Sequence, residues 1–196
     1  LGWLEDAELD PTGVLLATCS NWAIHVWNLD GRCVLTIPGK GVAWVSVAWS
    51  PHGTMIAGAN NHGQITVYST ADGSEIAQTT YRHESYSGSY PPKTLGPRPL
   101  EWSPDGSLLA HGWTDGEIEL FDPTSGDHVA TLKEEGYETE VVELAWSPDA
   151  ELIAATLVAP WHSDSKRISN TAILVYNVTE RNTLYTLDCL HTHPET

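Results

Sequence analysis

Residues that could bind a metal or start a nucleophilic reaction are few and scattered in this chain of 196 residues. His191 and His193 could both hold a metal ion, but a structural zinc site needs about four ligands and the sequence supplies no others. Cys19, Cys33 and Cys189 form no Cys-x-x-Cys pair, so we expect reduced thiols. No nucleophile elbow, phosphate-binding glycine loop or suitably placed carboxylate pair is found. The sequence therefore predicts no metal, no cofactor and no catalytic residue.

Aromatic and basic side chains, which dominate protein contacts, occur instead in two stretches that interrupt an otherwise regular pattern. One is the Pro-, Gly-, Ser- and Tyr-rich segment 82–98, and the other is 158–169. The first has the composition of a surface linker, the second is an insertion between two strands, and loops are also where binding residues concentrate. We predict a contact surface for another protein formed by six residues in or near these stretches: Tyr86, Tyr90, Trp113, Trp161, His162 and Arg167.

The elements that must position these residues repeat four times. Turns of the type Ser-Pro-Asp-Gly, or close variants, contain Pro11, Pro51, Pro104 and Pro148, which by subtraction lie 40, 53 and 44 residues apart. Such turns join short antiparallel strands, because Pro fixes φ, Gly accepts positive φ and Asp bonds its own backbone. In every copy the third strand has aliphatic second and fourth residues and an aromatic fifth residue. Four strands per period predict an all-β β-propeller with antiparallel meander blades.

The boundaries of the repeats follow from these turns. We predict one domain, 1–196, with four blades at 1–39, 40–81, 99–136 and 137–191, and insertions at 82–98 and 158–169. The acid-rich first strand, with Glu5, Asp6 and Glu8, suits a sheet edge. Trp22 stands in the turn after the second strand, where it is either packed or an exposed contact residue; we expect it to pack.

The repeated residues resemble the WD-repeat family over essentially the whole chain. The third copy is the most similar, with Ser103-Pro104-Asp105-Gly106, Asp115-Gly116 and Phe121-Asp122. The dipeptide Trp-Asp is absent, and Trp27-Asn28 or Tyr68-Ser69 stands in its place, so the resemblance depends on strands and turns. It implies a non-catalytic interaction platform, a scaffold or sensor module whose partners are other proteins or other domains of the same protein.

Both insertions are expected at one end of the blades. Alternate turns of a meander lie at opposite ends, so the turn after the second strand shares an end with the link after the fourth. The segments 82–98 and 158–169 therefore emerge together, away from the Ser-Pro-Asp-Gly turns. In the WD-repeat family, as the resemblance implies, this is commonly the narrow face that binds partners.

The charge balance argues against nucleic acid as a partner. There are 9 basic and 26 acidic residues, a net charge of −17, and no basic stripe to neutralise phosphates. No apolar run approaches the roughly 18 residues that span a bilayer, so we expect no membrane contact. Without a secretory signal pattern at Leu1, we expect a cytoplasmic protein; the missing Met suggests a cut or processed start.

An enzyme is the second hypothesis, because some propellers are hydrolases or lactonases with a site in the central channel. Such a site should show His, Asp or Glu repeated at one inner-strand position. The position after Leu-Ala instead reads Thr18, Gly58, His111 and Ala155, so we predict no enzyme.

Four blades are few for a WD-type ring. They would leave two open faces, for which we expect apolar residues such as Ile24, Val26, Ile173 and Val175. Three outcomes stay open. The missing blades lie elsewhere in the same protein, or a second copy or another subunit completes a ring of about eight, or four blades close alone.

Overall fold

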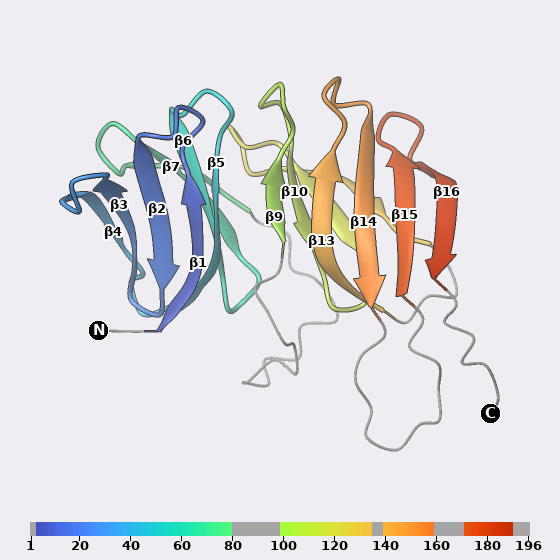
Figure 1. Ribbon diagram of the computed structural model, residues 1–196, viewed down its shortest axis with the longest axis horizontal. Helices are drawn as coiled ribbons and strands as arrows, with labels where there is room; N and C mark the ends of the chain where they lie inside the picture. The colour runs from blue at the N-terminus through green and yellow to red at the C-terminus, as the bar shows by residue number, and fades with distance from the viewer. Residues whose placement is uncertain (1–2, 80–98, 135–138, 159–170, 190–196) are drawn as a thin grey trace, which may run out of the picture.

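The computed structural model describes residues 3–79, 99–134, 139–158 and 171–189. All regular elements in this part of the chain are strands, which form four antiparallel four-stranded sheets (Figure 1). The all-β meander prediction is therefore confirmed. The predicted insertions, 82–98 and nearly all of 158–169, lie outside the described residues.

Each sheet contains four consecutive strands in chain order. The first sheet consists of β1 (Leu4–Leu9), β2 (Leu15–Ser20), β3 (Ala23–Asn28) and β4 (Cys33–Pro38). The second consists of β5 (Trp44–Trp49), β6 (Met55–Asn60), β7 (Ile65–Ser69) and β8 (Glu75–Gln78). The third consists of β9 (Leu100–Trp102), β10 (Leu109–Gly112), β11 (Ile118–Phe121) and β12 (His128–Leu132). The fourth consists of β13 (Glu140–Trp146), β14 (Leu152–Val158), β15 (Thr171–Asn177) and β16 (Asn182–Cys189).

The turn after each first strand is closed by the side chain of its leading residue. The hydroxyl oxygens of Ser50, Ser103 and Ser147 accept the backbone N–H five residues later, at 3.0, 2.9 and 2.9 Å. In the first sheet Asp10 does the same for the N–H of Leu15, at 2.6 Å. A short polar side chain that satisfies the turn backbone explains why Asp can replace Ser at this point.

Neighbouring sheets pack face to face through three apolar clusters. The first cluster joins the first and second sheets and includes Ile24 and Trp49. The next joins the second and third sheets through residues such as Val67 and Phe121, and the last joins the third and fourth. The sheets therefore stack in chain order, like blades along an arc.

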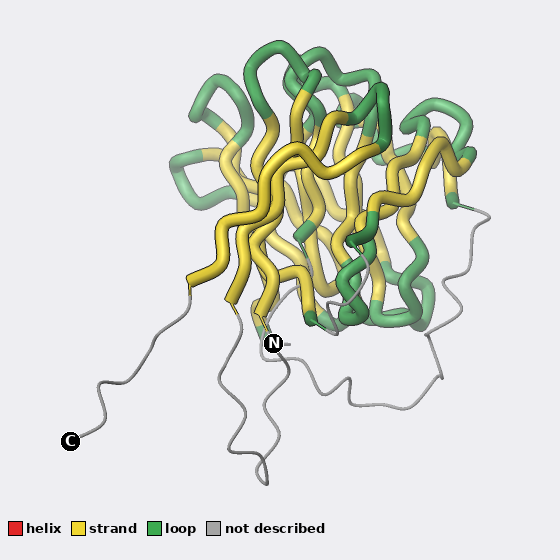
Figure 2. Tube along the Cα trace, turned by 90° about the vertical axis from the view of Figure 1, so that its right-hand side faces the viewer, coloured by secondary structure: helices red, strands yellow, loops and turns green. Residues whose placement is uncertain are grey.

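The first and fourth sheets lie at opposite ends of this row (Figure 1). None of the three clusters, which the described residues form, joins these two sheets, so each keeps one open face. Figure 2 views the molecule from the side of the fourth sheet. Its open face consists of residues from three strands, paired in register across the sheet: Ala154, Ile173, Val175, Tyr185 and Leu187.

The open face of the first sheet is not the one expected from the sequence. Ile24 and Val26 are only 0% and 2% exposed, because they face the second sheet. The opposite face, formed by Leu9, Leu16 and Trp27, is the open one. The prediction that Ile24 and Val26 lie on an open face was therefore wrong. The prediction that Ile173 and Val175 lie on an open face agrees with their half-buried state.

Candidate functional site

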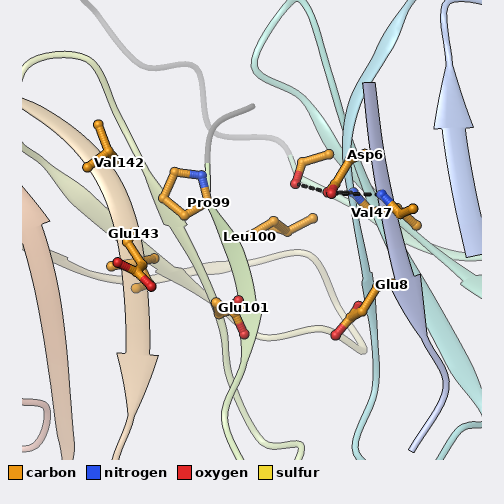
Figure 3. Close-up of a pocket in the computed structure, with 11 residues that line it drawn as sticks. Asp6, Glu8, Val47, Pro99, Leu100, Glu101, Val142 and Glu143 are labelled. Atoms are coloured by element: carbon orange, nitrogen blue, oxygen red, sulfur yellow. Dashed lines mark hydrogen bonds between the residues drawn. The ribbon is translucent and has the colours of Figure 1, made fainter. Parts of the chain in front are cut away.

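The first strands of all four sheets meet around a cavity of about 310 Å³ (Figure 3). Four carboxylates line it, contributed by β1, β9 and β13: Asp6, Glu8, Glu101 and Glu143. The remaining lining residues are backbone or apolar groups and one hydroxyl, among them Ser46, Val47, Pro99 and Leu100. The cavity therefore concentrates negative charge between strands that are far apart in the sequence.

The two acids of β1 are anchored to the neighbouring strand β5. Asp6 accepts hydrogen bonds from the Ser46 hydroxyl at 2.9 Å and from the Val47 N–H at 3.0 Å. Glu8 accepts the Trp49 N–H at 2.7 Å, and its carbonyl accepts the indole N–H of Trp49 at 3.1 Å. These bonds use backbone donors at the edge of β5, so Asp6 and Glu8 also help to join the first two sheets.

Two of the carboxylates hold a proton more tightly than an exposed glutamate does. Burial raises the pKa of Glu8 from 4.5 to about 7, against the opposing Trp49 hydrogen bond, and the charges of Glu101 and Asp6 add to it. Burial raises the pKa of Glu101 to about 7 as well, and the charges of Asp6 and Glu143 raise it further. Near neutral pH these two groups are therefore partly protonated.

The cavity can attract a cationic group or exchange protons near pH 7. It does not resemble a metal site, because the described residues contain no group of three His, Cys, Asp or Glu side chains placed to hold an ion. Our sequence analysis missed it because the position that we inspected lies on the second strand of each sheet. Glu8 and Glu101 are each the second-to-last residue of the first strand of their sheet. An acid shared at this position of two repeats is the sequence signal that could have predicted the cavity.

A second surface lies at the end of the molecule where β2 turns into β3. Trp22 in this turn is 72% exposed. Trp3, just before β1, and Leu4, the first residue of β1, are 81% and 66% exposed. The expectation that Trp22 packs was therefore wrong. Its backbone is nevertheless held in place, since its carbonyl accepts the Gly39 N–H at 2.8 Å.

Of the six predicted contact residues, the structure describes only Trp113. The others, Tyr86, Tyr90, Trp161, His162 and Arg167, lie outside the described residues, so their role stays a prediction. Trp113 is 3% exposed and packs edge-on against His111, with ring centroids 4.8 Å apart. Its burial is a reason against direct contact with a partner, because the indole packs against Gly63 in a turn of the second sheet.

A further structural finding concerns the membrane. The described residues contain no helix that is long and apolar enough to span a bilayer.

Comparison with known proteins is consistent with the repeat pattern. Residues 31–69 match the family model "WD domain, G-beta repeat", and residues 86–136 match "Anaphase-promoting complex subunit 4 WD40 domain". The chain is 29% identical over 125 residues to WD repeat-containing protein 1-B of Xenopus laevis, covering 56% of this chain and 19% of that protein. It is 26% identical over 99 residues to the Periodic tryptophan protein 2 homolog of Dictyostelium discoideum, covering 50% and 10%.

The chain thus spans less than a fifth of the length of each of these relatives. Residues 31–69 contain the strands from β4 to β7, and the described part of 86–136 contains β9 to β12. The Xenopus relative is itself named a WD repeat-containing protein. Four meander sheets, their turns and these matches together support the WD-repeat family for this chain.

Proposed function

We propose that this chain is a non-catalytic platform for protein–protein interaction and that a partner binds at the end marked by Trp22. Proteins of the WD40 type generally act as interaction scaffolds, which makes this class of function the starting point. The proposal adds a place on the molecule and the residues that make the contact.

The exposure of Trp22 is the observation on which the proposal depends. An exposed tryptophan on a fixed turn loses little conformational freedom when it is buried by a partner, and tryptophan is enriched among residues that dominate binding energy. Trp3 and Leu4 enlarge the apolar surface, because Leu4 pairs with Ser20, two residues before Trp22. Apolar patches of this kind on a folded domain mark contact sites.

The predicted insertion 158–169 is a second reason to propose a contact surface at the Trp22 end. β2 and β14 both finish at this end of the molecule, so the turn that holds Trp22 and the end of β14 lie at the same end (Figure 1). If the predicted contact residues Trp161, His162 and Arg167 act as proposed, they would extend the surface.

The proposal can be tested by comparing two variants that each replace a large, exposed apolar side chain in a turn of the first sheet by serine. Trp22→Ser removes the exposed indole, and Leu29→Ser removes a 70% exposed side chain from the turn at the opposite end of the first sheet. We expect Trp22→Ser to reduce capture of specific partners by at least about tenfold, and Leu29→Ser to leave it unchanged. Affinity capture with quantitative mass spectrometry and thermal unfolding would be measured for both. Equal capture by the two variants would exclude the Trp22 end.

A hydrolase or lactonase with a channel site is the second candidate. The observation in its favour is the pair Glu8 and Glu101, because a carboxyl group with a pKa near 7 suits general acid–base catalysis. An esterase and lactonase screen of the wild type beside Glu101→Gln would separate the two functions. Activity that the variant loses would favour the enzyme, and no activity in either protein would favour the platform.

A further inference from the structure

The inner edges of neighbouring sheets share a recurring hydrogen bond. Each sheet after the first has tryptophan as the last residue of its first strand: Trp49, Trp102 and Trp146. The indole N–H of Trp49 donates to the Glu8 carbonyl, and that of Trp102 donates to the Ala48 carbonyl, both at 3.1 Å. Glu8 and Ala48 are the second-to-last residues of the preceding first strands. At these two junctions the indole therefore fastens one inner strand to the strand before it.

The junction between the third and fourth sheets lacks this bond. Trp146 occupies the same register position as Trp49, since it pairs with Ile153 as Trp49 pairs with Ile56. Its indole nitrogen is buried but has no hydrogen-bond partner among the described residues. The carbonyl that matches the acceptor of the other junctions belongs to Glu101. Because a buried donor without an acceptor is unfavourable, an arrangement in which the Trp146 indole reaches this carbonyl should be accessible.

The same junction lacks a second bond that the first two sheets form. The Glu8 carboxylate accepts the backbone N–H of Trp49 at 2.7 Å. Glu101 has a carboxylate at the matching position, yet no hydrogen bond of its side chain is found among the described residues. The Trp146 N–H points to the inner edge, because adjacent N–H groups of a strand point to opposite edges and that of Ser147 bonds the β14 backbone. Donors and acceptors for both bonds are therefore present here.

The fourth sheet is held to the third away from this inner edge. Near the start of β13 the Val141 N–H donates to the Trp113 carbonyl at 2.9 Å. At the outer edge the Thr183 hydroxyl donates to the Glu134 carboxylate. The apolar cluster of the two sheets lies between them. A small rotation of the fourth sheet about these contacts would bring the end of β13 onto the end of β9 while the apolar cluster stays buried.

We propose that Glu101 is a latch that closes the junction of the third and fourth sheets when it ionises. In the closed junction the Glu101 carboxylate accepts the Trp146 backbone N–H, and the Glu101 carbonyl accepts the Trp146 indole N–H. In the open junction, as in this structure, the carboxyl group of Glu101 faces the cavity instead. This inference concerns the inner edges of the sheets and does not depend on the proposed function.

The charges around Glu101 explain why ionisation should favour closure. Asp6 and Glu8 face it from β1, and Glu143 faces it from β13 (Figure 3). The residues of β5 that line the cavity do not titrate, and His111 of β10 bonds a backbone carbonyl at 3.1 Å. A neutral carboxyl group can share its proton with one of the three carboxylates. An ionised one is repelled by all of them and gains an N–H donor by closing the junction.

The direction of the pH effect follows from the two states of Glu101. In the open junction, burial and the charges of Asp6 and Glu143 raise its pKa to about 7. Closure adds a hydrogen bond to the ionised form and moves the carboxylate away from Asp6, and both changes lower the pKa. The open junction therefore holds the proton more tightly. Raising the pH through 7 should increase the ratio of closed to open junctions, by about tenfold for each unit between the two pKa values.

Nuclear magnetic resonance of the complete chain with nitrogen-15 in its tryptophans tests the latch. Trp146→Phe assigns the indole signal of Trp146 by its loss. Between about pH 5.5 and about pH 8, this indole proton should move downfield, because it becomes hydrogen-bonded. The indole proton of Trp102 is the internal control, since it is already bonded to a carbonyl and should stay in place. A Trp146 signal that is the same at both pH values would overturn the proposal.

Two matched variants then identify the group that titrates. Glu101→Gln has no proton to lose and should abolish the pH-dependent shift of Trp146. Glu8→Gln should keep the shift, because its amide oxygen still accepts the Trp49 N–H. The indole signal of Trp49, which is bonded in both states, reports whether each variant is folded. A shift that persists in Glu101→Gln, or one that is lost in Glu8→Gln alone, would assign the titration to another carboxylate and overturn the role of Glu101.

Discussion

Ile118 in the third sheet and Ile173 in the fourth occupy the same position in two copies of one repeat. Ile118 is 0% exposed because the fourth sheet covers it, whereas Ile173 is only half-buried. The first two sheets have isoleucine here too, Ile24 and Ile65, at 0% and 1% exposed. The residue type is therefore the same at the open end of the row as in its interior, and only its surroundings differ.

The interior sheets and the end sheets therefore share a residue pattern but differ in burial, and this difference predicts a difference in stability. An interior sheet gains apolar burial on both faces, whereas an end sheet gains it on one. The end sheets should therefore unfold locally at lower free energy than the interior sheets. Substitutions at matched positions measure how large that difference is.

Truncation of the matched isoleucines should give the largest effect. We expect Ile118→Ala to lower the free energy of unfolding by about 3 to 4 kcal/mol, because it leaves a cavity between two sheets. Ile173→Ala should lower it by only about 1 kcal/mol, because the half-exposed side chain loses less burial. Urea unfolding of both variants would measure the two values. Equal losses would mean that the fourth sheet is covered after all.

A matched pair of glycines should give a smaller difference. Ala at either Gly126 or Gly31 must adopt a positive φ, 77° or 78°, at a cost of about 1 kcal/mol. Gly126→Ala should cost about 1 to 2 kcal/mol more, because its methyl group would overlap the Gln78 carbonyl. Thermal unfolding of Gly126→Ala beside Gly31→Ala isolates the contact between sheets from the strain of the turn. If Gly31→Ala is as destabilising, another group already occupies the space beside the first sheet.

The four sheets and their turns could be predicted from the sequence because their signals are local. Ser103 closes its turn with Leu108, five residues away, and the alternating strand that ends in Phe121 needs only its own residues to be read. The face of each sheet that packs on its neighbour could not be predicted in the same way. Ile24 and Leu16 are equally apolar, and no periodicity within the first sheet tells which of its faces meets the second sheet. That is why the open face was assigned to Ile24 and Val26.

The carboxylate cavity was missed for a similar reason. Glu8 and Glu101 are brought together by the arrangement of the inner strands, and each alone is an ordinary acid in a strand. Trp22 was predicted to be packed and is exposed instead. A tryptophan in a turn is usually packed, and its exposure depends on which neighbouring groups are present beside the first sheet.

End sheets and interior sheets should not differ at the carboxylate cavity, where we expect the smallest effects on the free energy of unfolding. Glu8 belongs to an end sheet and Glu101 to an interior sheet, yet the pKa of each is about 7 against an ordinary value of 4.5. Between these pH values the folded chain holds two protons that the unfolded chain has released. The free energy of unfolding should therefore fall as the pH rises from 4.5 to 7, by about 1 kcal/mol for each group because both are partly solvated.

Glu8→Gln and Glu101→Gln should each remove about half of this pH dependence, and the double variant should be nearly flat between pH 5 and about 7.5. The measurement stays above pH 4.5, because hydrogen bonds from the Ser103 hydroxyl and Ser107 lower the pKa of Asp105 in the opposite direction. Urea unfolding at a series of pH values would give the slopes. An unchanged slope in both single variants would assign the pH dependence to the overall negative charge of the chain, and a change in Glu101→Gln alone would mean that the Trp49 hydrogen bond keeps Glu8 ionised.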